Sequence, residues 1–437
     1  MDDSFESPPQ GVPFREAWRA WVRVAVHSFG GPAGQIAVIH RVVVDEKRWV
    51  DEEHFLHALS YCMLLPGPEA QQLATYLGWL LHGTRGGLTA GLLFVLPGFL
   101  SILLLSLLYV TSQEVAFVSA VFYGLKPAVL AIVLEAVFRL KRRAVADRQS
   151  TAIAALAFLA IFAFGVPFPL IVLSAALVGY ILGRPGDVVP APRATAAPIG
   201  YTLRTAALWL GIWLVPVFGL VLALGHGHVL VQEALFFSKA AVVTFGGAYA
   251  VLAYVAQQAV DVYHWLGPGE MLDGLGLAET TPGPLIMVTQ FVGFVGASRQ
   301  PGDLHPLLAG VAGSVVTTWV TFTPCFLFVL AGAPWIERLR GNRGLNAALR
   351  GIMAAVVGVV LNLAVWFALH AVFTEVRNVA WGPLALPVPG VSSLDLGAAA
   401  IAGLAAFAVF RLKWGMFAVL GAGAAAGVLI RLLVTLR

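Results

Sequence analysis

Two Pro-Gly-Pro triplets are the residues of this chain best placed to do chemistry. They occupy residues 66–68 and 282–284, each beside apolar stretches. Proline has no amide hydrogen and suits the first position of a helix, so each triplet is predicted to end one helix and begin another. The amides that follow, of Glu69, Ala70 and Gln71 in the first copy, would form a positive helix end that suits an anion. The alternative is that each triplet only kinks a packed helix pair.

A Phe-Gly-Gly triplet precedes each Pro-Gly-Pro triplet, at residues 29–31 and 245–247. Ser28 and Thr244 stand directly before them. Glycine lets an oxyanion approach backbone amides without a side chain in the way. Small residues also allow membrane helices to pack closely, so binding and packing are both open interpretations.

Two cations lie close to the Phe-Gly-Gly triplets. Lys239 lies six residues before Phe245 in an otherwise apolar stretch, and Arg23 holds the matching place in the first copy. Ionisable residues inside membrane segments are costly and usually functional, although a long cation near a helix end can reach the interface instead. We expect Lys239 to attract an anion, whereas Arg23 fits the interfacial interpretation better.

Four ionisable residues are candidates for coupling ion movement to transport. Glu69 follows the first Pro-Gly-Pro triplet, either as a cap that stabilises the helix dipole or as a proton carrier. Glu279, just before the second triplet, supplies an acid in the other half. Lys126 and Glu135 share one predicted span at a separation of nine, too far to pair with each other, so each needs a partner elsewhere.

The chain shows no strong signal for a metal, a cofactor or an enzymatic reaction. The two cysteines are far apart and sit in apolar context, which predicts packing rather than a redox pair. Histidine pairs at 54 and 57 and at 226 and 228 are weak metal signals. Nucleophile elbows, Walker-type loops and HExxH motifs are missing from the sequence, so ATP-driven pumping and common hydrolytic reactions lack support.

The composition is that of a chain dissolved in a lipid bilayer. Of 437 residues 59% are hydrophobic and 11% charged, against about 25% charged in soluble domains. We predict an all-α polytopic membrane protein with about ten to twelve membrane segments, since roughly 20 apolar residues cross the hydrocarbon core. The stretches 53–65 and 68–82 are shorter and predict broken or re-entrant helices. The long apolar runs are Gly86 to Val110, Val115 to Leu140, Tyr201 to Leu224, Pro306 to Leu330 and Leu345 to Val372.

The chain is an internal repeat. Both triplets recur 216 residues later, and beyond an insertion near residues 298–305 the offset becomes 227, which places Pro97 on Pro324 and Gly124 on Gly351. The predicted organisation is an N-terminal tail (1–13), a first transporter repeat (14–184), a cytoplasmic linker with a connecting transmembrane helix (185–227) and a second transporter repeat (228–437). The acidic, polar start of the chain does not predict a cleaved signal peptide.

The two halves carry their basic loops in opposite places. Arg41, Lys47 and Arg48 follow the first Phe-Gly-Gly triplet, and the equivalent segment 257–265 has no Lys or Arg. Residues 337–343 hold three arginines where their counterpart near Thr111 has none. Because basic loops stay in the cytoplasm, the halves are predicted to have opposite orientations, as in inverted-repeat transporters. The net charge of +4 therefore reports orientation rather than nucleic-acid binding.

Taken together, these segments resemble the chromate ion transporter family in its long, two-domain form. The resemblance rests on residues 29–35 (FGGPAGQ), 59–74 (LSYCMLLPGPEAQQLA), 244–249 (TFGGAY) and 281–284 (TPGP). It implies a bacterial inner-membrane protein that exports chromate and confers resistance to it. The second half has Leu285 where the first has Glu69, so its site cannot be fully symmetric.

Several alternatives stay open at this point. Chromate and sulfate are tetrahedral dianions of similar shape, so a sulfate transporter is the nearest rival, followed by an anion channel and a membrane-embedded sensor or enzyme. The expected partners are the anion and the lipid bilayer, without nucleic acid, and a homodimer is left open. The candidate binding residues are Arg23, Phe29, Gly30, Gly31, Pro66, Gly67, Pro68, Glu69, Gln71, Lys239, Thr244, Phe245, Gly246, Gly247, Pro282, Gly283 and Pro284, and the candidate coupling residues are Glu69, Lys126, Glu135 and Glu279.

Overall fold

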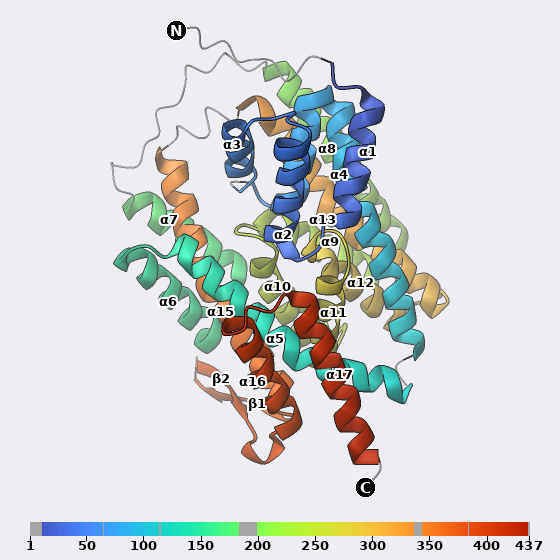
Figure 1. Ribbon diagram of the computed structural model, residues 1–437, viewed down its shortest axis with the longest axis vertical. Coiled ribbons are helices and arrows are strands. Elements are labelled where there is room, and N and C mark those ends of the chain that lie inside the picture. Colours follow the sequence, from blue (N-terminus) through green and yellow to red (C-terminus); the bar gives the residue numbers. More distant parts are fainter. Residues whose placement is uncertain are drawn as a thin grey trace.

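The computed structural model describes residues 11–63, 65–112, 115–182, 199–335, 343–382 and 384–435, and they are mostly helical (Figure 1). The first half contains α1 (Phe14–His27), α2 (Gly31–His40), η1 (Arg41–Glu46), α3 (Glu52–Cys62), α4 (Glu69–Ser112), α5 (Ala116–Ala144), α6 (Arg148–Phe164) and α7 (Phe168–Leu182). After the connecting helix α8 (Ile199–Leu224) come α9 (Val229–Val243), α10 (Ala248–Gln257), η2 (Gln258–Val262), α11 (Pro268–Thr280), η3 (Leu285–Met287), α12 (Val288–Arg299), α13 (Pro306–Gly332), η4 (Ala333–Trp335), α15 (Arg343–Val372), β1 (Val376–Trp381), β2 (Leu384–Pro389), η5 (Val391–Ser393), α16 (Leu396–Phe410) and α17 (Met416–Thr435).

Six helices within the described residues are long and apolar enough to cross a membrane. They are Glu69–Ser112, Ala116–Ala144, Ile199–Leu224, Pro306–Trp335, Gly344–Val372 and Met416–Leu433. Four shorter apolar helices accompany them: Arg148–Phe164, Phe168–Leu182, Leu285–Arg299 and Leu396–Phe410. The prediction of an all-α polytopic membrane protein is confirmed, and the long apolar runs of the sequence fall within these helices.

The helix α4 is two helices joined at a sharp turn. His82 and Gly83 have non-helical backbone angles, and Gly83 has φ 59°. The two arms fold back on each other because Gly78 and Gly86 have no side chains, and a Cβ at Gly78 would lie 2.5 Å from the Gly86 oxygen. The short arm before this turn and the long arm after it therefore form a helical hairpin. In the second half a loop separates α12 from α13 at the same place.

The halves repeat each other in backbone detail. Each Phe-Gly-Gly hairpin ends in a π-helix, η1 or η2, followed by a residue with positive φ, Arg48 (51°) or His264 (53°). These two residues are 216 apart, and a tryptophan, Trp49 or Trp265, follows each and donates its amide to a carbonyl six residues earlier. Two segments with different sequences thus adopt the same irregular conformation.

The halves run in opposite directions. Gly87 of α4 lies against Leu330 of α13, and Gly91 lies against Phe326. Residue numbers rise along one helix as they fall along the other, so these two equivalent helices are antiparallel. Figure 1 shows α1 and α3 at one end of the molecule and the end of α17 at the other. This arrangement agrees with the opposite orientations that the loop charges predicted.

The last helices of each half pack on the other half. α5 packs against α16 and α17, and α15 packs against α6 and α7. Glycine pairs allow the close approach: a Cβ at Gly124 would lie 1.9 Å from the oxygen of Gly423, and one at Gly179 would lie 2.5 Å from the oxygen of Ala347, next to Gly351. The two halves are interlocked rather than merely apposed.

A two-stranded antiparallel sheet interrupts the helical pattern between α15 and α16. β1 pairs with β2 from Val376 opposite Pro389 to Trp381 opposite Leu384. The sequence analysis did not predict these strands. The first half has only three residues between α5 and α6, so this hairpin is an addition of the second half.

Some sequence predictions fall outside the described residues. Residues 183–198 cover most of the predicted cytoplasmic linker, and residues 336–342 contain two of the three arginines in the basic loop of the second half.

Candidate functional site

Each Pro-Gly-Pro loop is held by the Phe-Gly-Gly region of the other half. The Gly67 amide donates to the Thr244 carbonyl at 2.8 Å, and the Gly283 amide donates to the Ser28 carbonyl at 2.9 Å. Both glycines have positive φ, 129° and 97°, which other residues adopt only with strain. The four predicted triplets therefore meet at the interface between the halves.

The long helices support these loops at equivalent points. Gly67 faces Cys325 of α13, and Gly283 faces Gly98 of α4, where a Cβ would lie 3.0 Å from the Gly98 Cα. Cys325 and Gly98 are 227 residues apart, so they hold the same place in the two repeats. The prediction that Cys325 is a packing residue agrees with its burial under Gly67.

Ser28 and Thr244 use their hydroxyl groups within their own helices. Ser28 Oγ donates to the Val24 carbonyl and Thr244 Oγ1 to the Ala240 carbonyl, both at 2.6 Å. These bonds end the incoming helices α1 and α9. At this position the hydroxyl groups shape the Phe-Gly-Gly turns, and their carbonyls hold the opposite loop.

The helix starts after the Pro-Gly-Pro loops leave backbone amides without helical partners. In α4 the Gln72 amide bonds back to the Pro68 carbonyl at 3.1 Å, so the three amides before it precede the first helical bond. In the second half the Met287 amide bonds to the Pro284 carbonyl at 2.9 Å, which leaves the amides of Leu285 and Ile286. This is the helix-start geometry that the triplets predicted, and anion binding there stays a prediction.

Buried glutamines brace the loops. Gln35 Nε2 donates to the Gly283 carbonyl at 2.6 Å, and Gln72 Nε2 donates to the Pro66 carbonyl at 2.7 Å. The predicted donor Gln71 bonds instead to Thr75 Oγ1 at 3.1 Å. Gln35 is not among the predicted site residues. It lies four residues after the Phe-Gly-Gly triplet, and its buried side chain points inward from α2.

Two carboxylates flank the second Phe-Gly-Gly loop. A Cβ at Gly247 would lie 3.6 Å from Glu69 Oε1, so Glu69 faces this loop from the other half. Two residues later Tyr249 donates a short hydrogen bond from its hydroxyl to Glu279 Oε1. Glu279 is buried and Glu69 half-buried. The structure thus brings together Glu69, Gly247 and Glu279 and adds Tyr249, which the sequence analysis missed.

The end of α5 carries cations whose charges act on these carboxylates. Glu135, Arg139 and Arg143 are spaced by four and share one helix face, and Arg139 Nη2 lies 2.9 Å from Glu135 Oε1. The charge of Arg143 acts on Glu69, and those of Arg139 and Glu135 act on Glu279. The sequence analysis ended this span at Leu140 and did not name the two arginines as site residues. The spacing of four residues from Glu135 to Arg139 and again from Arg139 to Arg143 was the available signal.

Lys126 lies in a separate ion pair. Its Nζ is 3.3 Å from Asp273 Oδ2, and the Tyr109 hydroxyl donates to the same oxygen at 2.8 Å. Asp273, on α11, is only 3% exposed. Asp273 is therefore the partner that Lys126 was predicted to need, and it joins α5 of the first half to the second half.

The structure does not bring Arg23 or Lys239 to the loops. Arg23 is exposed and its Nη1 lies 2.6 Å from Glu46 Oε2. Lys239 lies on an exposed face of α9 with Leu235 and Val242, and no hydrogen bond or ion pair joins it to another described residue. The buried face of α1 is apolar, and that of α9 is apolar apart from Glu233, so both cations point outward. Their binding roles stay predictions.

The two Phe-Gly-Gly loops have different surroundings. A Cβ at Gly246 would lie 3.0 Å from Val356 of α15, and Met353 is also close, whereas among the described residues a Cβ at the equivalent Gly30 would have only the Gly34 Cα of its own hairpin within 4 Å, at 3.9 Å. α10 packs along α15, but among the described residues α2 makes no comparable contact with α5. We call the second hairpin closed because it packs on its long helix, and the first open because it does not.

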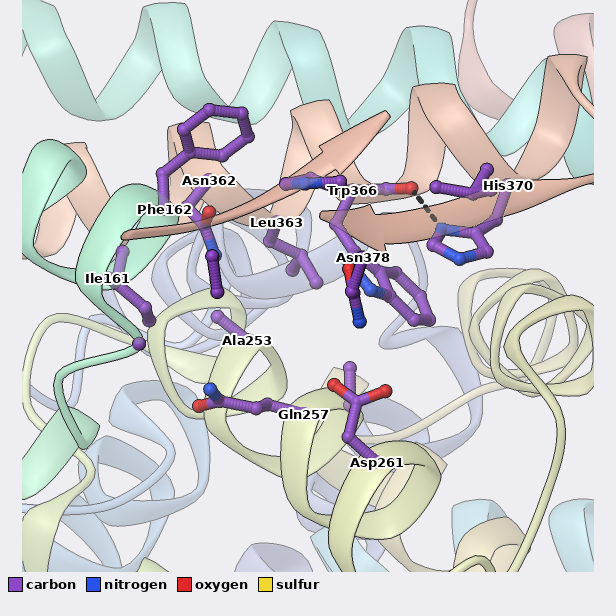
Figure 2. Close-up of a pocket in the computed structure, with 15 residues that line it drawn as sticks. Ile161, Phe162, Ala253, Gln257, Asp261, Asn362, Leu363, Trp366, His370 and Asn378 are labelled. Carbon is purple, nitrogen blue, oxygen red and sulfur yellow. Dashed lines mark hydrogen bonds between the residues drawn. The ribbon is translucent and has the colours of Figure 1, made fainter. Parts of the chain in front are cut away.

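The closed side contains a polar cavity of about 190 Å³ between α6, α10, α15 and the β-hairpin. Figure 2 shows Gln257 and Asp261 on one wall, facing Asn362, His370 and Asn378 on the other. At the offset of 227, Asn362 and His370 correspond to Glu135 and Arg143, so the same helix face is charged on the open side and carries an amide and an imidazole on the closed side.

Two oppositely oriented repeats, with broken helices meeting between them and ionisable groups around the break, define a secondary membrane transporter. The sequence profile described as "Chromate transporter" matches residues 15–180 and 231–428. The chain belongs to the chromate transporter family.

Relatives agree with this assignment. A chromate transport protein of Pseudomonas aeruginosa is 34% identical over 362 residues, 82% of each chain, and one of Cupriavidus metallidurans is 27% identical over 352 residues, 80% of this chain and 82% of the relative. An uncharacterized transporter of Bacillus subtilis is 23% identical over 154 residues, which are 35% of this chain but 86% of the relative. That relative is comparable in length to one repeat. No solved structure matches the chain.

Proposed function

We propose that this protein carries chromate, or a tetrahedral oxyanion like it, out of the bacterial cytoplasm across the inner membrane and so confers resistance to chromate. The observation that carries the proposal is the pair of Pro-Gly-Pro helix starts, each bonded to the Phe-Gly-Gly region of the opposite half. The names of the relatives at 34% and 27% identity support chromate as the anion.

The proposed binding site uses backbone groups at both helix starts. The amides after Pro68 and Pro284 provide hydrogen-bond donors and partial positive charge to an anion between the halves. Arg139 and Arg143 attract the anion, and they are the cations whose charges reach Glu69 and Glu279. Glycine at the turns allows the oxyanion to approach the backbone.

The difference between the two Phe-Gly-Gly loops supports alternating access. The second loop packs on α15, and the first could pack on α5 in the same way because the helices are equivalent in the repeat. Exchanging the two arrangements would close the open side and open the closed one. The polar cavity beneath the β-hairpin would then become the route on the far side.

Loop charge supports export. The open hairpin α1–α2 carries Arg41, Lys47 and Arg48 at its outer end, and basic segments face the cytoplasm. In this state the site would receive an anion from the cytoplasm. An inside-negative potential then favours expulsion by about 2.3 kcal/mol per charge per 100 mV.

Chromate uptake into inside-out vesicles, with sulfate as competitor, tests the proposal. Arg143→Gln should raise the half-saturating chromate concentration severalfold, while Arg142→Gln, its neighbour on another helix face, should behave like the wild type. Gly283→Ala should abolish uptake because of its positive φ and its contact with Gly98. Equal behaviour of the two arginine variants would contradict the site, and no uptake above empty vesicles would contradict chromate export.

The same vesicles separate the rival functions. A carrier should saturate and be accelerated by chromate on the far side, whereas a channel should show neither property. Sulfate uptake that exceeds chromate uptake would favour the sulfate transporter. A homodimer stays a prediction.

A further inference from the structure

Glu233 is a buried carboxyl group that the proposed site does not use. It lies in the second turn of α9 and is 0% exposed. Neither of its carboxyl oxygens has a hydrogen-bond partner among the described residues. Buried polar groups almost always have such a partner, so this exception needs an explanation.

Two glycines make room for the Glu233 carboxyl group. A Cβ at Gly296 of α12 would lie 3.0 Å from Oε1, and one at Gly313 of α13 would lie 3.0 Å from Oε2. Trp265 also lies against Gly296 and encloses the group. The nearby amide of Ala297 lies within α12, where the helix already uses it.

The first half fills the corresponding space with apolar side chains. Glu233 corresponds to Ala17, which is buried, and Gly296 corresponds to Leu80, with a second leucine at 81. Both leucines pack on the apolar core of the first half. At the matching places the second half has glycine instead of leucine and glutamate instead of alanine. Since the first half fills this space with apolar side chains alone, packing does not require a carboxyl group at this position.

An ionised carboxylate in this position would be very unfavourable. The group is sealed from bulk water, and among the described residues neither a cation nor the unpaired Nε1 of Trp265 bonds to it. Buried acids in such places take up a proton instead. Three ionisable groups on the surrounding elements lie at helix ends: His228 at the start of α9, His305 at the start of α13, and Arg299 at the end of α12. Others are the exposed Lys239 of α9, Tyr249 and Tyr254 of α10, and the buried thiol of Cys325 on α13. Glu270 of α11 already pairs with Arg299. α8 has Tyr201 and Arg204 only in its first turns.

We propose that the Glu233 carboxyl group is a proton-binding site that couples proton movement to anion transport. Its proton is bound while α9 packs on α12 and α13, and it passes to water when the α9–α10 hairpin leaves α15 and the carboxyl group ionises. The hairpin that holds Glu233 is the one closed here, which links the proton to the conformation. This coupling role rests on the proposed transport function, but the protonation of Glu233 does not.

The transport test uses proteoliposomes with a pH gradient and chromate as substrate. Glu233→Gln keeps the shape of the side chain but cannot titrate. We expect this variant to transport chromate without responding to the pH gradient, while the wild type and Glu53→Gln, an exposed carboxylate on α3, respond alike. The variant Glu233→Ala with Gly296→Leu copies the apolar filling of the first half and should also lose the response. An unchanged response in either Glu233 variant would overturn the coupling role.

Infrared spectroscopy of the purified protein tests protonation separately. The carbonyl stretch of a protonated carboxyl group should be present in the wild type and in Glu53→Gln and should lose intensity in Glu233→Gln. Identical spectra would overturn the proposal even if transport is altered. If the wild type carries no chromate, the proposed function fails, and the infrared difference still decides whether Glu233 holds a proton.

Discussion

The two Phe-Gly-Gly hairpins have the same fold, yet one is packed and the other is open. Both end in a π-helix and a positive-φ residue, and both hold the opposite Pro-Gly-Pro loop. Only the second packs on its long helix, through Gly246 against α15. Similar local structure in two environments fits the proposed alternating access, in which the hairpins would move as units and exchange contacts with α5 or α15.

The largest expected effect concerns Lys126, which corresponds to Met353 on the closed side. Lys126→Met copies the closed side but leaves Asp273 buried without its cation. Removing one partner of a buried pair costs about 3 to 5 kcal/mol, and we expect the lower end because Lys126 is partly exposed. Chemical denaturation in detergent should show this loss. Arg23→Met, which breaks an exposed pair, should cost less than about 1 kcal/mol, and equal losses would contradict the assignment.

A second comparison places valine at three glycines of the two Phe-Gly-Gly loops, of which Gly31 and Gly247 are equivalent. Gly31→Val and Gly247→Val both force valine into positive φ, at a cost of roughly 1 to 2 kcal/mol. Gly246→Val adds a clash with Val356 and Met353, and overpacking costs a further 1 to 3 kcal/mol, roughly. In thermal unfolding, Gly246→Val should therefore have a lower melting temperature than Gly31→Val and Gly247→Val. The same melting temperature for all three would show that the second loop is not packed on α15.

Thiol labelling measures the open and closed sides directly. Ala37 of α2 and Ala253 of α10 are equivalent, but Ala37 is exposed and Ala253 is buried. A cysteine at 253 can react only in the state in which the second hairpin has left α15. If that state makes up 10% of the molecules or less, this cysteine should react at least about tenfold more slowly than one at 37. The native Cys62 and Cys325 are buried and add little background. Chromate should reduce the ratio of the labelling rate at 37 to that at 253. Equal rates at the two positions without chromate would rule out the difference between the open and closed sides.

The smallest effect concerns the start of α3. Asp51 accepts from the His54 amide at 2.7 Å, whereas Glu270 caps the equivalent start of α11 at Gly267. The His54 amide lowers the pKa of Asp51 below its ordinary value of 3.8. Because the pKa of Asp51 is lower in the folded protein, the ionised carboxylate stabilises the fold fully at pH values above 3.8. This stabilisation is lost as the pH falls through the lowered pKa.

Denaturation at two pH values checks this cap. Asp51→Ala should cost about 1 kcal/mol near neutral pH and less at acid pH. The matched variant Gly267→Ala should not show that pH dependence. A loss for Asp51→Ala that is the same at both pH values would refute the charged cap.

Much of the architecture was visible in the sequence because it depends on local patterns. Apolar length predicted the long helices, and the offsets of 216 and 227 predicted the repeat and the equivalence of its triplets. Proline and glycine act on their own backbone, so the breaks at 66–68 and 282–284 could be predicted from those residues alone. Loop charge predicted opposite orientations because basic residues resist crossing the membrane.

The contacts between the halves could not be predicted in this way. Nothing near Gly67 in the sequence names Thr244 as its partner, and the turn of α5 that carries Arg143 toward Glu69 depends on how α5 packs on the other half. The periodicity of a helix predicts which residues share one face, but it does not predict which other element packs against that face.

The sequence by itself determined the membrane class, the repeated halves and the two broken-helix motifs, because each follows from hydropathy or backbone chemistry over a short stretch. The tertiary structure alone decided that each Pro-Gly-Pro loop is held by the opposite half, that Lys126 pairs with Asp273, that Glu233 is sealed without a partner and that one hairpin is closed. These features depend on distances between residues far apart in the chain, which packing sets and local preferences do not.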